Sequence, residues 1–70
     1  MTTFELREKG TAYFATETLS FGNRTQRLVP VHFASWTDAE AYLRQRGAGE
    51  ERLREAQRDL ILKQSADLEL

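Results

Sequence analysis

The chain has 70 residues, with ten Lys or Arg against eleven Asp or Glu, a net charge of −1 and no cysteine. A chain of this length forms one domain, residues 1–70, with room for one hydrophobic core. Without cysteine there is no disulfide framework, no thiolate nucleophile and no cysteine-based zinc site. No apolar run approaches the roughly 20 residues that span a bilayer, so we expect a cytoplasmic protein.

The first predicted element is a β-hairpin. Apolar and polar residues alternate over 4–7, and a run rich in β-branched and aromatic residues extends over 11–21. Gly10 suits the left-handed position of a three-residue loop between these runs. Such a loop pairs Phe4 with Phe14.

The second predicted hairpin turns at Gly22 and Asn23, two residues that tolerate positive φ and therefore suit a tight turn. Counting back from this turn pairs Thr18 with Arg27. Pro30 has no N–H to donate to a strand ladder, so the third strand is expected to be an edge strand or to bulge there.

Alternation along the strands assigns each side chain to one of two sheet faces. The predicted inner face carries Phe4, Leu6, Ala12, Phe14, Val29, Val31 and Phe33. The predicted outer face is half apolar and carries Tyr13, Ala15, Glu17, Leu19, Phe21, Leu28, Pro30 and His32.

Two helices are predicted after the strands. Thr37 and Glu40 form a capping box that starts the first helix, and Gly47 suits its end. The second helix is expected to begin at Glu50, with a buried stripe of Leu53, Ala56, Leu60 and Ile61. Residues 65–70 are expected to form a tail that can fray.

These elements predict an α+β fold. Its architecture is a three-stranded antiparallel β-meander followed by two α-helices, β-β-β-α-α, packed on one sheet face. Two short helices cover only one face of the sheet, and the apolar outer face is therefore expected to remain exposed.

The sequence offers little for catalysis. His32 is the only histidine, and no serine has the flanking glycines and base of a nucleophile. Adjacent carboxylates fall in first helical turns, where they stabilise the helix. We therefore predict no enzyme activity, no catalytic or metal-binding residues and no cofactor, although a small enzyme could still combine His32 with carboxylates.

The leading functional prediction is a small protein-protein interaction module of bacterial or phage type. It would work as a homodimer or an accessory subunit and contact its partner through the outer sheet face and the edge strand. The predicted partner-binding residues are Tyr13, Leu19, Phe21, Leu28 and Pro30.

The alternative prediction is a nucleic-acid-binding regulator that uses arginines of the helices and a hairpin: Arg24, Arg44, Arg46, Arg52, Arg54 and Arg58. Acidic residues interleave with the arginines of the second helix, which makes that surface nearly neutral toward phosphates. The sequence therefore favours the protein-interaction hypothesis.

Overall fold

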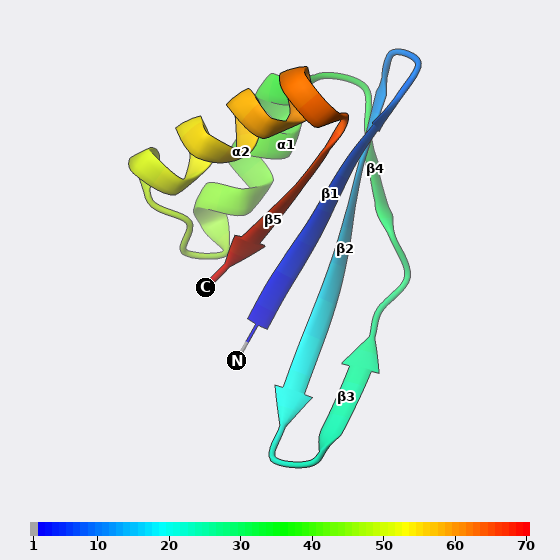
Figure 1. The fold of residues 1–70 in the computed structure, drawn as a ribbon, viewed down its shortest axis with the longest axis vertical. Coiled ribbons are helices and arrows are strands. Elements are labelled where there is room, and N and C mark those ends of the chain that lie inside the picture. The colour runs from blue at the N-terminus through cyan, green and yellow to red at the C-terminus, as the bar shows by residue number, and fades with distance from the viewer. Residues whose placement is uncertain (1) are drawn as a thin grey trace.

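The computed structural model describes residues 2–70, which form an antiparallel sheet and two helices (Figure 1). The elements in chain order are β1 Thr2–Lys9, β2 Ala12–Phe21, β3 Arg24–Arg27, β4 Val31–Phe33, α1 Trp36–Gln45, α2 Glu50–Lys63 and β5 Ser65–Glu69. The predicted α+β class is confirmed. The predicted three-stranded meander is wrong, because the order is β-β-β-β-α-α-β and the sheet has five strands.

The last strand is the largest departure from the predicted fold. Residues 65–70, predicted to fray, include β5, which pairs with β1 at one edge of the sheet. Leu68 lies opposite Phe4 and is 1% exposed. Gln64, at a left-handed φ of 61°, ends α2 and turns the chain back toward β1. The segment is held because its apolar side chains complete the core.

The second hairpin has the predicted register. Its loop is Gly22–Asn23, Phe21 pairs with Arg24, and Thr18 pairs with Arg27. Gly22 has a φ of 56°, the positive value that tight hairpin loops require. The turn residues Gly22 and Asn23 were therefore sufficient to predict the register of this hairpin.

The third predicted strand breaks near Pro30, as its missing N–H led us to expect. Leu28 still donates its N–H to the carbonyl of Glu17. Pairing resumes one position out of step, with Val31 opposite Ala15, so the strand is divided into β3 and β4. The extra residue between them is a bulge in the edge of the sheet.

The first hairpin has a different register from the predicted one. Its loop contains two residues, Gly10 and Thr11, and the φ of Gly10 is 64° at the first loop position. As a result Phe4 pairs with Glu17 rather than with Phe14. The shift is three residues, and an odd shift turns every β2 side chain to the other face relative to β1.

This shift corrects the predicted faces. The inner face, which the helices cover, carries Phe4, Leu6, Tyr13, Ala15, Glu17, Leu19, Val31, Phe33, Ala66 and Leu68. Tyr13 and Leu19 were predicted on the outer face, and this prediction is wrong, because both lie on the inner face. Phe14, predicted to be in the core, lies on the opposite face, and Val29, also predicted inside, is 85% exposed in the bulge.

Helix α1 begins two residues earlier than predicted. Ser35, not Thr37, is the N-cap: its backbone is extended and its hydroxyl accepts a hydrogen bond of 3.3 Å from the Asp38 N–H. Gly47 follows the helix with a φ of 104°, which agrees with its predicted role in ending α1.

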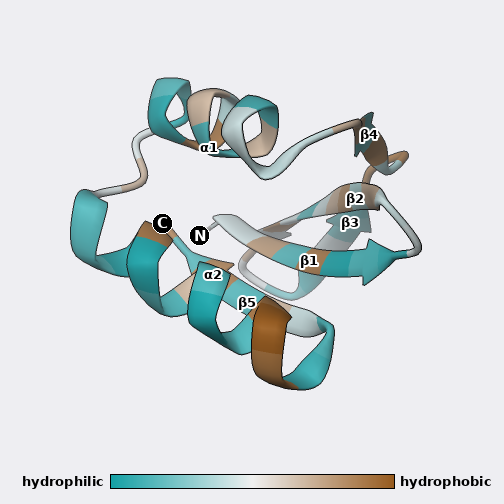
Figure 2. Ribbon diagram, turned by 90° about the horizontal axis from the view of Figure 1, so that it is seen from above, coloured by the Kyte–Doolittle hydropathy of each residue, from teal (hydrophilic) through white to brown (hydrophobic). Residues whose placement is uncertain are grey.

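Helix α2 begins at Glu50 as predicted and buries Leu53, Ala56 and Leu60. Ile61 was predicted in this stripe but is 72% exposed, and Figure 2 shows the hydrophobic last turn of α2 on the outside. Neither helix within residues 2–70 is long and apolar enough to cross a membrane.

The core lies between the inner sheet face and the two helices. α2 contacts β1 and β5, while α1 contacts β2 and β4. The helices leave the far end of the β2–β3 hairpin uncovered, so this end projects beyond them (Figure 1). We call residues 18–27 the arm.

Candidate functional site

Among residues 2–70, both helices lie on one face of the sheet, and we call the other face the open face. Directly paired residues point to the same side of a sheet, so the pairing gives its rows of side chains. One row consists of Ser65, Arg7, Phe14 and His32. The next row consists of Asp67, Glu5 and Thr16.

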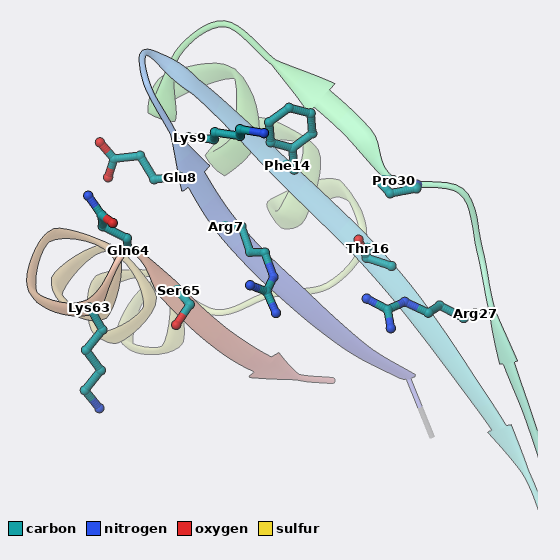
Figure 3. A pocket seen from close by; sticks show the side chains of 10 residues that line it. All are labelled: Arg7, Glu8, Lys9, Phe14, Thr16, Arg27, Pro30, Lys63, Gln64 and Ser65. Carbon is teal, nitrogen blue, oxygen red and sulfur yellow. The ribbon is translucent and has the colours of Figure 1, made fainter.

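An open hollow of about 570 Å³ lies on this face (Figure 3). It draws residues from β1, β2, β3 and β5, from the end of α2 and from the bulge. We call it the open-face pocket, and its lining residues are Arg7, Glu8, Lys9, Phe14, Thr16, Arg27, Pro30, Lys63, Gln64 and Ser65.

The pocket is cationic although the chain has a net charge of −1. Its lining includes four cations, Arg7, Lys9, Arg27 and Lys63, and the carboxylate of Glu5 on the same face pairs with two of them. Glu8 also lines the pocket, but it pairs with Tyr13 of the inner face. Figure 3 shows Lys9 extending over β2 toward Phe14 and Lys63 projecting at the rim. The strand pairing and the end of α2 thus concentrate positive charge that is dispersed in the sequence.

Glu5 holds the two arginines of the pocket together. Arg7 Nη2 lies 2.7 Å from Glu5 Oε1, and Arg27 Nη2 lies 3.2 Å from Glu5 Oε2. Figure 3 shows the Arg27 guanidinium close to Thr16 and the Arg7 guanidinium over β1. A guanidinium has five N–H donors, so Glu5 uses only part of the hydrogen-bonding capacity of each arginine.

The hydrogen bond from Arg7 lowers the pKa of Glu5, and the charges of Arg27 and Arg7 add to this effect while burial opposes it. A lowered folded-state pKa stabilises the protein above the unfolded-state pKa, and this contribution is lost as pH falls through the folded-state pKa.

We expect Glu5→Gln to lower the free energy of unfolding by less than about 1 kcal/mol at neutral pH. In thermal melts across pH, the difference from the wild type should shrink toward acid. A difference that stays constant with pH would contradict the ionic role of Glu5, and Glu69→Gln on β5 is the control.

Phe14 supplies the aromatic wall of the pocket. Its half-buried ring lies 5.1 Å from the ring of His32 at a tilt of 58°. Pro30, from the bulge, adds a second apolar group to the lining. The pocket therefore offers charge-assisted hydrogen-bond donors beside an apolar ring, a combination suited to binding anions.

The five predicted partner-binding residues do not form one surface. Tyr13 packs against the core, with its ring 6.1 Å from that of Trp36. Leu19 and Leu28 are half-buried, while Phe21 is 59% exposed. Pro30 is exposed and lines the open-face pocket.

A smaller apolar surface remains where the inner face extends past the helices. Leu19 on β2 pairs with Thr2 on β1, and the Thr2 carbonyl accepts a hydrogen bond from the Leu70 N–H, so Leu19 and Leu70 lie in one row across the sheet with β1 between them. Phe21 follows on the same face, and Leu70 is 37% exposed. We call this surface the apolar end, defined by Leu19, Phe21, Leu28 and Leu70.

The six arginines of the nucleic-acid alternative are also dispersed. Arg24 lies on the arm, whereas Arg52, Arg54 and Arg58 are exposed on α2. Arg44 pairs with Glu40 at 3.1 Å and with Glu50 at 2.7 Å. Arg46 pairs with the buried carboxylate of Glu17. None of the six lines the open-face pocket.

None of the four cations that line the open-face pocket was among the predicted site residues. Arg7 and Lys9 alternate with Leu6 along β1, so a strand period of two already placed them on the polar side. Arg27 joins them only through the corrected register of β2. Lys63 joins them because β5 brings the end of α2 beside β1, which the predicted tail did not include.

Comparison with known proteins finds no match: no family model fits the chain, and no curated protein or solved structure is similar to it.

Proposed function

We propose that this protein is a non-enzymatic interaction module that self-associates through the apolar end. The observation that carries the proposal is Phe21, which is 59% exposed on an arm that projects past both helices. Leu19 lies two residues before it on the same face and is partly uncovered, and Leu70 lies across β1 from Leu19. Removing these side chains from water would favour association.

A second copy of the chain is the partner that we favour. A two-fold axis would bring the same apolar end of each subunit together, so that each Phe21 gains a covered site. A 70-residue domain has limited stability from one core, and association adds stability to the folded state. An accessory role within a larger assembly would use the same surface.

The arginine-based nucleic-acid alternative has weaker support. Arg44 contacts two carboxylates and Arg46 neutralises the buried carboxylate of Glu17, which reduces the charge they present to phosphates. On α2, Glu51 and Glu55 are exposed among the arginines. We therefore place self-association first.

Phe21→Ser tests the proposal. We expect the wild type to elute with the mass of two chains in size-exclusion chromatography with light scattering, and Phe21→Ser to shift to the mass of one chain. Ile61→Ser is the matched control, because Ile61 is a large apolar residue that is 72% exposed but lies on α2. A monomeric wild type at high concentration, or equal effects of both substitutions, would rule out the apolar end as the interface.

A further inference from the structure

We propose that the open-face pocket binds a nucleotide, with the phosphate held by Arg7 and Arg27 and the base against Phe14. The juxtaposition that carries this inference is a pair of arginines from β1 and β3 beside an aromatic ring from β2, in one hollow. The site lies on the open face, whereas the apolar end belongs to the inner face, so the two proposals stand independently.

The phosphate position follows from the shared carboxylate. Glu5 contacts both guanidinium groups, which shows that Arg7 and Arg27 can reach one anionic group at the same time. Phosphate offers more acceptor oxygens than a carboxylate and matches the planar fork of arginine. The remaining N–H donors of both arginines, with Lys9 nearby, can bind a phosphate alongside Glu5 or in its place.

Charge sets the side of the pocket on which the phosphate lies. Asp67 pairs with Glu5 across β1 and β5, so the open face becomes negative toward the free edge of β5. Lys9 lies in the pocket lining beyond Arg7, away from that carboxylate row. The phosphate should therefore occupy the β1–β2 side of the pocket, above Arg7.

The ring position follows from the apolar lining. Phe14 pairs directly with Arg7, so the two residues lie on neighbouring strands of the pocket, and Figure 3 shows the Phe14 ring on the Lys9 side of Arg7. Base stacking on an aromatic side chain stabilises binding without selecting one base. A volume of about 570 Å³ falls in the range of small-molecule sites, and a nucleotide combines the ring and the phosphate that the lining accommodates.

The nucleotide can be free or part of a single strand, because the hollow is open along the sheet. Titration of the isotope-labelled protein with AMP, followed by NMR, should move the amide signals of Arg7, Phe14 and Thr16 and leave that of Leu53 unchanged. Inorganic phosphate and adenosine, each lacking half of the ligand, should bind at least about tenfold more weakly than AMP.

Arg27→Gln should weaken AMP binding about tenfold, since a charge-assisted donor is lost. Arg24→Gln is the matched control, because Arg24 lies on the same strand but does not line the pocket. Phe14→Leu should weaken AMP more than phosphate. Glu5→Gln should strengthen AMP binding a few-fold, because it removes the competing carboxylate and leaves both arginines in place.

A short single-stranded oligothymidylate distinguishes the two sources of the nucleotide. Tighter binding than AMP, with a strong salt dependence, would identify a strand, and equal or weaker binding would identify a free nucleotide. The proposal is overturned if neither probe shifts the pocket signals, if Arg24→Gln and Arg27→Gln have equal effects, or if phosphate binds as tightly as AMP.

Discussion

Replacing Leu68 with alanine should destabilise the protein more than any substitution on its surface. Leu68 is 1% exposed, and deletion of such a side chain removes buried apolar contacts and leaves a cavity that costs about 2–5 kcal/mol. A single small core supplies a total stability of only about 3–5 kcal/mol. Leu68→Ala should therefore be largely unfolded at 25 °C, as circular dichroism during urea titration would show.

Leu62→Ala is the matched control, because it makes the same chemical change at a residue that is 71% exposed. It should alter the free energy of unfolding by no more than about 0.5 kcal/mol. Leu68→Met, which conserves volume, should retain most of the stability. Equal effects of Leu62→Ala and Leu68→Ala would show that residues 65–70 do not pack as a strand.

The C-terminal strand could have been predicted from its own residues. Ala66, Leu68 and Leu70 alternate with polar side chains, which is the period of a half-buried strand. The run follows a helix without a break in composition, and only the left-handed backbone of Gln64 separates them. Because a non-glycine residue rarely adopts that conformation, the sequence contains no clear marker of the turn.

The register of the first hairpin shows a different limit. Gly10 indicates a turn, but both two-residue and three-residue loops can place a glycine at positive φ. The choice decides whether Phe14 or its neighbours Tyr13 and Ala15 enter the core. Packing against α1, where Tyr13 meets Trp36, favours the second arrangement, and no local pattern in the strand contains that information.

The unmarked turn before β5 and the register of the first hairpin also limit how much of the candidate site the sequence predicts. The polar side of β1 was predictable, and it supplies Arg7 and Lys9. The positions of Arg27 and Phe14 beside them depend on the β2 register, and that of Lys63 depends on β5. A site assembled from four strands, the end of a helix and a bulge is determined by strand order, which alternation within a strand does not specify.

The ion pair between Arg46 and Glu17 is expected to contribute strongly to the stability of the fold. Glu17 is a carboxylate on the inner face that is only 6% exposed. Arg46 also donates to the Tyr42 hydroxyl at 3.1 Å, and its guanidinium lies 5.4 Å from the centre of the Phe4 ring. The hydrogen bond with Glu17, supported by Tyr42, raises the pKa of Arg46. This arginine therefore joins the end of α1 to β2 and shields the core.

Arg46→Ala should lower the Tm on the order of 10 °C, because it leaves a buried carboxylate without its partner. Arg44→Ala is the control: Arg44 pairs with Glu40 and Glu50 on the surface, where ion pairs contribute little. The double variant Glu17→Gln, Arg46→Ala should recover part of the lost Tm, since the buried charge is gone. If the double variant is as unstable as Arg46→Ala, the loss comes from the packing of Arg46 on Phe4 and Tyr42, and the charge of Glu17 has no part in it.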